Sequence, residues 1–367
     1  MGRKVKRGSA RMKQDQKINK NRNKNIFIKN IYYMLAFAYQ TLQGRDFIEA
    51  GAEDFEHIYD LYAKILERGM VNQVKRGVYK EYQEKKEGMK VIKGRIELAD
   101  SMQGWGRKEG EIICSFDDFT EDCKFNQIIK AVGYFLMTRQ EVKKENRKAL
   151  KKVLLRFSEV KLISWREIVW DKIRFYRNSA SYEMLLYVCR CTIERELLTE
   201  QRRERKVKDY WEEQNLPKLF ERFVLEYYKI YFPQYKPIAK KITWDIEGNK
   251  RYLPDMRTDV KMNFRDRCLI IDTKFYKTEM QKYYERETIH SANLYQIYTY
   301  VKNEDKENKK NVAGVLLYAK TVEGKELDEE YQMGGSKIGV VTIDLGKEFC
   351  EIEKRLRELV ERYLLVG

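Results

Sequence analysis

The chain has 367 residues, of which 43% are hydrophobic and 36% are charged. This length fits two domains with real apolar cores, and no apolar run is long enough to span a bilayer, so we expect a cytoplasmic protein without a membrane partner. The six cysteines form no C-x-x-C pair and only two histidines are present, which argues against zinc fingers and HNH-type nucleases.

The charge balance is strongly basic, with a formal net charge of +17. Residues 1–25 hold ten Lys and Arg and a single Asp, so we expect a disordered basic tail there. The rest of the chain also has a positive balance. A basic folded part suits a polyanionic partner such as nucleic acid.

Residues 26–205 are expected to form an N-terminal domain that is mostly helical, of α+β type. Apolar residues recur with helical spacing in most of it, and Gly94 interrupts a strand-like run, which indicates a bulge or a close backbone approach. The segment 71–91 fits either a helix or a hairpin. The expected helices are 28–42, 54–67, 119–137, 142–157 and 181–205, and the expected strands are 91–98 and 112–116.

Residues 206–367 are expected to form a second domain of α/β class, with a mixed central sheet flanked by helices. Its first helix is predicted to begin at Pro217, because proline is tolerated in the first turn of a helix. The expected helices are 217–232, 289–301 and 347–364, and the expected strands are 242–246, 256–264, 268–275, 312–318 and 338–345.

The most informative stretch is the pair of predicted strands on either side of residues 265–267. Asp259 lies in the first strand, and Asp272 and Lys274 lie at the end of the second, after an apolar run. Side chains alternate along a strand, so Asp272 and Lys274 share one face, about 7 Å apart at their Cα atoms. Two carboxylates beside a lysine can hold a divalent cation near a phosphate, which is the layout of a metal-dependent phosphodiesterase.

Two alternatives remain open at this point. Asp255 follows Pro254 and could replace Asp259 as the first carboxylate, although its place at the strand entry favours a solvated turn. Asp272 and Lys274 could also form a surface ion pair without chemistry, worth less than about 1 kcal/mol.

Several motifs together resemble a known family. Asp259, Asp272-Thr273-Lys274 and the segment from Gln296 to Tyr300 are similar to the RecB-like branch of the PD-(D/E)xK nucleases. Four further segments resemble the McrC family, the nuclease subunit of McrBC modification-dependent restriction systems: residues 30–39, 93–98, 125–130 and 219–224. The likeness runs from about residue 26 to the C-terminus. Thr258-Asp259 departs from the Pro-Asp of the family name, but the carboxylate is retained.

The resemblance implies roles for individual residues. Asp259, Asp272 and the carbonyl of Thr273 would bind Mg²⁺ (or Mn²⁺), and Lys274 would stabilise charge or orient the attacking water. Glu221 resembles the acidic residue that often completes such a site, although it could simply be a polar residue on its helix. Gln296 would position Lys274 or a phosphate.

The resemblance also implies partners. The substrate would be double-stranded DNA, and the N-terminal domain would dock on a hexamer of a separate AAA+ GTPase. The chain contains no P-loop sequence, so it is not expected to hydrolyse nucleotides by a P-loop itself. Two other functions remain open: a self-sufficient RecB-like nuclease in repair or defence, and an adaptor that binds DNA or a motor without cutting.

Overall fold

The computed structural model describes residues 26–39, 55, 57–102, 111–174, 180–201, 206–275, 280–283, 286–307, 309, 311–320 and 325–365. The chain forms two compact units. One consists of Met1–Leu61 together with Leu197–Gly367, and the other is Tyr62–Glu196. The predicted division after residue 205 differs from this one chiefly at the N-terminal end, where residues before Tyr62 join the C-terminal unit. The predicted tail, 1–25, lies outside the described residues.

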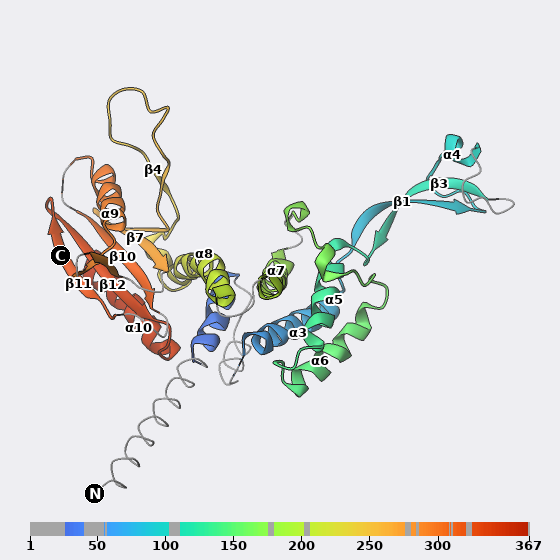
Figure 1. The fold of residues 1–367 in the computed structure, drawn as a ribbon. Coiled ribbons are helices and arrows are strands. Elements are labelled where there is room, and N and C mark those ends of the chain that lie inside the picture. Colours follow the sequence, from blue (N-terminus) through green and yellow to red (C-terminus); the bar gives the residue numbers. More distant parts are fainter. Residues whose placement is uncertain are drawn as a thin grey trace, which may run out of the picture. The chain divides into compact units, whose positions relative to one another are not determined.

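The C-terminal unit contains a sheet flanked by helices (Figure 1). Its unlabelled first helix covers residues 26–38. The other elements are α8 (Lys206–Tyr231), η5 (Pro233–Tyr235), β4 (Lys241–Ile242), β5 (Met256–Arg257), β6 (Val260–Phe264), β7 (Arg267–Phe275), β8 (Met280–Tyr283), β9 (Arg286–Ile289), α9 (Ser291–Glu304), β10 (Val312–Lys320), β11 (Asp328–Met333), β12 (Ser336–Asp344), α10 (Phe349–Val360) and the π-helical η6 (Glu361–Leu365).

The five-stranded sheet has the order β11-β12-β10-β7-β6. The three inner strands β12, β10 and β7 run parallel, and the outer strands β11 and β6 each pair antiparallel with their neighbour. The expected mixed central sheet is therefore confirmed. The inner strands are almost continuously apolar because helices cover both of their faces.

Helix α9 packs on one face of this sheet, against Ile270, Leu316 and Val340 among others. It approaches β10 closely because Gly314 has no side chain: a Cβ atom there would lie 2.7 Å from atoms of Ile297 and Val301. Helix α8 lies on the other face of β7, where the rings of Phe220 and Phe275 meet at 6.2 Å. The sheet is thus held between helices, and the strand ends are left for polar residues.

The helix at residues 26–38 belongs to the C-terminal unit through specific contacts. The amide of the buried Asn30 donates hydrogen bonds of 2.8 Å to the carbonyls of both Leu345 and Lys347. Phe37 lies 5.6 Å from the rings of Phe223 and Phe349. Buried polar groups require such partners. Through these contacts the helix packs into a core whose other residues come more than a hundred positions later in the chain.

The unit Tyr62–Glu196 is helical apart from a small antiparallel sheet of order β1-β3-β2. Its elements are α3 (Ile58–Arg76), β1 (Glu81–Met89), β2 (Arg95–Ile96), α4 (Leu98–Met102), β3 (Ile112–Thr120), α5 (Lys124–Met137), α6 (Lys144–Leu154), the short 3-10 helices η1 (Leu155–Phe157), η2 (Trp165–Glu167) and η3 (Trp170–Lys172), and α7 (Ala180–Gln201). The expected α+β character is confirmed for these residues. Among the described helices, none has a stretch long and apolar enough to cross a bilayer.

Several predicted boundaries were wrong. Pro217 does not begin a helix but lies inside α8. The predicted strand 91–98 shrinks to Arg95–Ile96, because Gly94 adopts a φ of 70° where a Cβ atom would lie 2.4 Å from the carbonyl oxygen of Ser115. The predicted strand 256–264 is split: β5 pairs with β4, whereas β6 pairs with β7.

Candidate active site

The site predicted from the sequence lies where β6 begins and β7 approaches its end. Val260 on β6 pairs with Ile271 on β7 in antiparallel register. Continuing this register by one residue places Asp259 opposite Asp272. Asp259 does not lie inside a strand as predicted but in the bend between β5 and β6, where the buried Thr258 hydroxyl donates to the Lys240 carbonyl at 3.1 Å.

Asp272 is buried, with 2% of its surface exposed, on an inner strand of the sheet. Its Oδ2 lies 2.7 Å from the Nζ of Lys274, which shares its face of β7. Burial raises the pKa of Asp272 to about 6, the Lys274 charge opposes that increase, and the Asp259 charge adds to it. A surface ion pair, the alternative left open by the sequence, is excluded because this carboxylate is inside the protein.

Asp259 is oriented by the strand that carries Asp272. Its Oδ2 accepts two hydrogen bonds of 2.7 Å, from the backbone N–H and from the hydroxyl of Thr273. Thr273, between Asp272 and Lys274 on β7, therefore links β7 to the bend that precedes β6. The contact fixes one carboxylate oxygen of Asp259, so its direction is set by the protein rather than by a ligand.

Lys274 is held from the other side by α9. Its Nζ donates to Oε1 of Gln296 at 2.9 Å, and Nε2 of Gln296 donates to the hydroxyl of Tyr300 at 2.8 Å. Gln296 and Tyr300 are one helical turn apart and face β7 together. The lysine ammonium is thus positioned between a carboxylate and an amide that is itself hydrogen-bonded.

Glu221 on α8 is electrostatically part of the same site. Burial raises its pKa, the charges of Asp259 and Asp272 raise it further, and Arg257 and Lys274 oppose the increase. The three predicted carboxylates are therefore close enough to repel one another. Asp255 is elsewhere: its side chain is 74% exposed and pairs with Lys241 at 2.5 Å.

The residues fit a divalent cation held by few protein ligands. Repulsion among these carboxylates is relieved by a positive ion, and carboxylate oxygens suit Mg²⁺, which usually binds one or two of them and keeps several waters. No group of three His, Cys, Asp or Glu in the described part of the chain is arranged to hold a metal. Glu221 is therefore not part of a preformed cage with Asp259 and Asp272.

The sequence interpretation missed Arg257. It precedes Asp259 by two residues, and its side chain is exposed while that of its neighbour Met256 packs into the core. The alternation of Met256 and Arg257 would have indicated this outward direction. It could not have indicated that the arginine lies near Glu221, because that residue comes from a distant helix.

Comparison with known proteins gives three findings. The family model described as McrBC 5-methylcytosine restriction system component matches residues 9–319. The Type IV methyl-directed restriction enzyme EcoKMcrBC of Escherichia coli (strain K12) is 25% identical over 344 residues, covering 92% of this chain and 98% of that protein. A chain in the refined half-complex from the tetradecameric assembly of Thermococcus gammatolerans McrB AAA+ hexamers with bound McrC is similar in fold. Its TM-score is 0.50 and its identity 16%, over 91% of this chain and 75% of that one.

Proposed function

The chain belongs to the family of McrBC 5-methylcytosine restriction system components, and on that premise we propose that it is the McrC-type subunit that cuts DNA. It would act as a metal-dependent endodeoxyribonuclease on double-stranded DNA, together with a separate AAA+ GTPase. The observation that carries this proposal is the grouping of Asp259, Asp272 and Lys274 at adjoining strand ends, with Asp272 buried and its pKa raised to about 6.

A buried carboxylate that faces other carboxylates lowers the stability of the fold, because desolvation and like charges both oppose its ionisation. Its presence therefore favours a functional role. A bound Mg²⁺ or Mn²⁺ would supply Lewis acidity toward the phosphate and acidify a bound water. Asp259, Asp272 and the Thr273 carbonyl are the groups that would hold such an ion, and Glu221 would add negative charge beside it.

Lys274 would stabilise the negative charge that develops on the phosphate during cleavage. Its ammonium is held by Asp272 and Gln296, so little reorganisation is needed when a phosphate arrives. Gln296 is a positioning residue in this scheme, because its amide touches the lysine and Tyr300. The PD-(D/E)xK assignment rests on these residues and on the mixed sheet that carries them.

The partner is proposed from the family and from the solved assembly. In the Thermococcus gammatolerans assembly, McrC is bound to McrB AAA+ hexamers. We propose that this chain binds a comparable hexamer, through a module made largely of the unit Tyr62–Glu196. The chain lacks a P-loop sequence, so GTP hydrolysis and the translocation that it drives would be tasks of the partner. The family resemblance assigns recognition of the modified base to the partner as well.

The decisive experiment compares two aspartates on the same sheet. Asp272→Ala should lower metal-dependent cleavage of DNA by at least about a thousandfold, because several kcal/mol of stabilisation at the phosphate disappear. Stimulation of the partner's GTPase should persist. Asp328→Ala, on the opposite edge strand β11, is the matched control and should leave cleavage unchanged.

Undiminished cleavage by Asp272→Ala would remove the site assignment. The role of the partner is tested separately: the purified chain alone should cut poorly, and addition of a GTPase encoded beside it should activate cleavage. Robust cleavage by the chain alone would favour a self-sufficient nuclease.

A further inference from the structure

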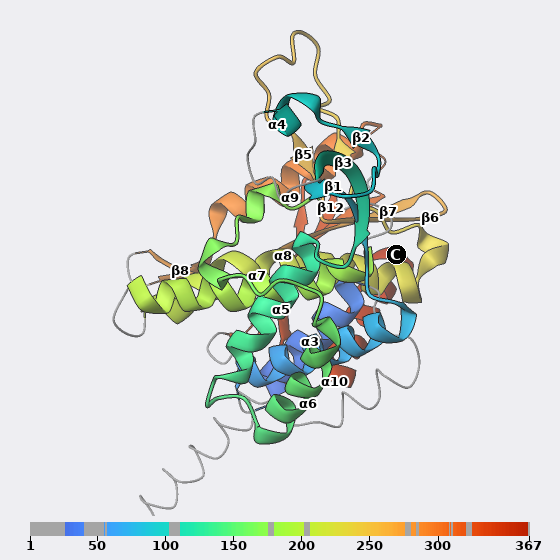
Figure 2. The same ribbon diagram turned by 90° about the vertical axis from the view of Figure 1, so that its right-hand side faces the viewer.

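The segment between β4 and β5, residues 243–255, projects from the sheet past the end of α9 (Figures 1 and 2). Two basic residues, Lys250 and Arg251, stand directly before an aromatic one, Tyr252. We call residues 243–255 the β4–β5 loop. Its two cations stand beside three acidic residues, Asp245, Glu247 and Asp255, so its positive charge is local to Lys250 and Arg251. The loop has no role in the site described above, although it lies in the same unit of the chain.

Hydrogen bonds within the loop join its beginning to its end. The indole N–H of Trp244 donates to the carbonyl of Pro254 at 2.7 Å, and Nζ of Lys250 donates to the carbonyl of Trp244 at 2.9 Å. The backbone N–H of Asp245 donates to Oδ1 of Asn303 on α9 at 2.7 Å. The base of the loop is therefore attached to the helix that supplies Gln296.

Tyr252 is not used for packing. It is 88% exposed, the largest exposure among the large hydrophobic residues in the described part of the chain, and Leu253 beside it is 37% exposed. The guanidinium of Arg251 lies 5.5 Å from the centre of its ring. An exposed aromatic ring beside two cations gains nothing from the protein core, but it offers an apolar surface and positive charge to a ligand.

The loop leads directly into the candidate active site. Its last residue is followed by β5 and then by Asp259. Arg257 and Lys241 are cross-strand partners on β5 and β4, and both are exposed. Lys241 is paired with Asp255 at 2.5 Å, so Arg257 is the cation that continues the positive charge of Arg251 toward the carboxylates. Its charge lowers the pKa of Glu221 against the effect of burial.

We propose that the β4–β5 loop binds the DNA duplex through Arg251 and Tyr252, next to the phosphate that is cut. Arg251 contacts the phosphate backbone, and the ring of Tyr252 lies against deoxyribose and base edges. This inference rests on the proposed function for the identity of the substrate. Cationic side chains dominate affinity for phosphates, and an aromatic ring adds a contact that does not depend on sequence.

The experiment measures binding of the full-length chain to a labelled duplex in the presence of a chelator, so that no cleavage occurs. Tyr252→Ala should weaken binding roughly tenfold, the loss expected for an aromatic contact with nucleic acid. Arg251→Glu should weaken it by a similar factor and lower the slope of log affinity against log salt by about one.

Each variant has a matched control. Tyr331→Ala removes an exposed tyrosine from β11, and Lys354→Glu, on the exposed face of α10, changes the net charge by the same amount as Arg251→Glu. Neither control should change the affinity. Arg251→Lys, which keeps the charge, should restore most of the binding, and thermal unfolding of all variants should match that of the parent.

Affinity and salt slope equal to those of the parent in both loop variants would overturn the proposal. Normal DNA binding combined with weaker binding to the GTPase partner would also overturn it, because the loop would then be a protein contact. The two proposals fail separately: if Asp272→Ala still cuts DNA while the loop variants lose DNA binding, the nuclease site is wrong and the DNA contact remains.

Discussion

Asp272 on β7 and Asp328 on β11 belong to the same five-stranded sheet, yet their surroundings shift their pKa values in opposite directions. The pKa of Asp272 is raised to about 6 by burial, which outweighs the attraction of Lys274. The pKa of Asp328 is lowered by its hydrogen bond with Arg362, with Arg355 contributing further. The surroundings of Asp272 thus disfavour its ionised form, whereas two arginines stabilise the ionised form of Asp328.

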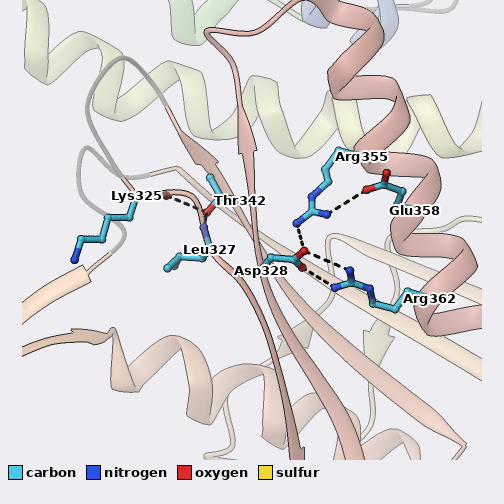
Figure 3. Close-up of polar contacts among 7 residues, drawn as sticks. All are labelled: Lys325, Leu327, Asp328, Thr342, Arg355, Glu358 and Arg362. Carbon is cyan, nitrogen blue, oxygen red and sulfur yellow. Dashed lines mark hydrogen bonds and ion pairs between the residues drawn. The ribbon is translucent and has the colours of Figure 1, made fainter.

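The geometry at Asp328 explains its favourable environment (Figure 3). Arg362 donates to both carboxylate oxygens, at 2.6 and 3.3 Å, and Arg355 approaches Oδ2 at 2.9 Å. Arg355 also contacts Glu358 at 3.1 Å. These groups connect the edge strand β11 to α10 and η6, so the network stabilises the fold. Asp328, Arg355 and Glu358 line a hollow between β11, β12 and α10.

The opposite pKa shifts distinguish a carboxylate that stabilises the fold from one that is kept for function. Asp328 retains solvent contact and two cationic partners, so its ionisation favours the folded state. Asp272 has one cation, little solvent and a second carboxylate opposite it. A sequence shaped for stability alone would not keep that arrangement, because neutral residues of similar size would fit at lower free energy.

The largest effect on stability is expected for Asp272→Asn. A pKa raised from 3.8 to about 6 means that the aspartate stabilises the fold when protonated and loses this contribution as the pH rises through about 6. Relative to the parent, the variant should therefore gain up to about 3 kcal/mol of unfolding free energy between roughly pH 4 and pH 8. Denaturant unfolding in the presence of a chelator measures this difference. A constant difference across that range would show that Asp272 is not buried as described.

A smaller effect, on catalysis, is expected for Gln296→Ala. Without the amide, Lys274 keeps its contact with Asp272 but is no longer held from α9. Turnover at saturating DNA should fall roughly tenfold, as for other residues that orient an active-site group, while the apparent affinity for DNA stays the same. Gln332→Ala, an exposed glutamine on β11, is the matched control. A loss of DNA affinity without a loss of turnover would assign Gln296 to substrate binding instead.

The smallest effect is expected for Asp328→Asn. Its lowered pKa means that the ionised carboxylate stabilises the fold above its ordinary pKa of 3.8 and loses this contribution as the pH falls through the lowered value. Because these side chains are partly exposed, the loss at neutral pH should be less than about 1 kcal/mol. Unfolding at neutral pH in low and high salt measures it, since salt should reduce the difference. A change in unfolding free energy larger than that of Asp272→Asn would reverse the comparison between the two aspartates.

Much of the candidate site followed from local pattern. The apolar run before Asp272 predicted a buried strand, and the alternation along it placed Lys274 on the same face. The antiparallel pairing around residues 265–267 also followed, because a short polar turn joins two strand-like segments. These features depend on residues within a few positions of one another, so the sequence was sufficient to predict them.

Other features depend on residues far apart in the chain. The break at Thr258 arises because β5 pairs with β4 and not with β7, and the edge strand β11 has an exposed, polar sequence that gave no strand signal. The grouping of residues 26–38 with the C-terminal unit depends on contacts such as those of Asn30 with Leu345 and Lys347.

The sequence by itself determined the chemistry available to this protein: two aspartates and a lysine on two predicted neighbouring strands, on a chain with a basic balance. The tertiary structure alone decided how those groups behave. Burial between helices raises the pKa of Asp272, a helix from another part of the chain positions Lys274, and the charges of Asp259, Asp272 and Arg257 all act on Glu221. Desolvation and charge–charge interactions depend on distance in space, and distance in space is set only when the chain has folded.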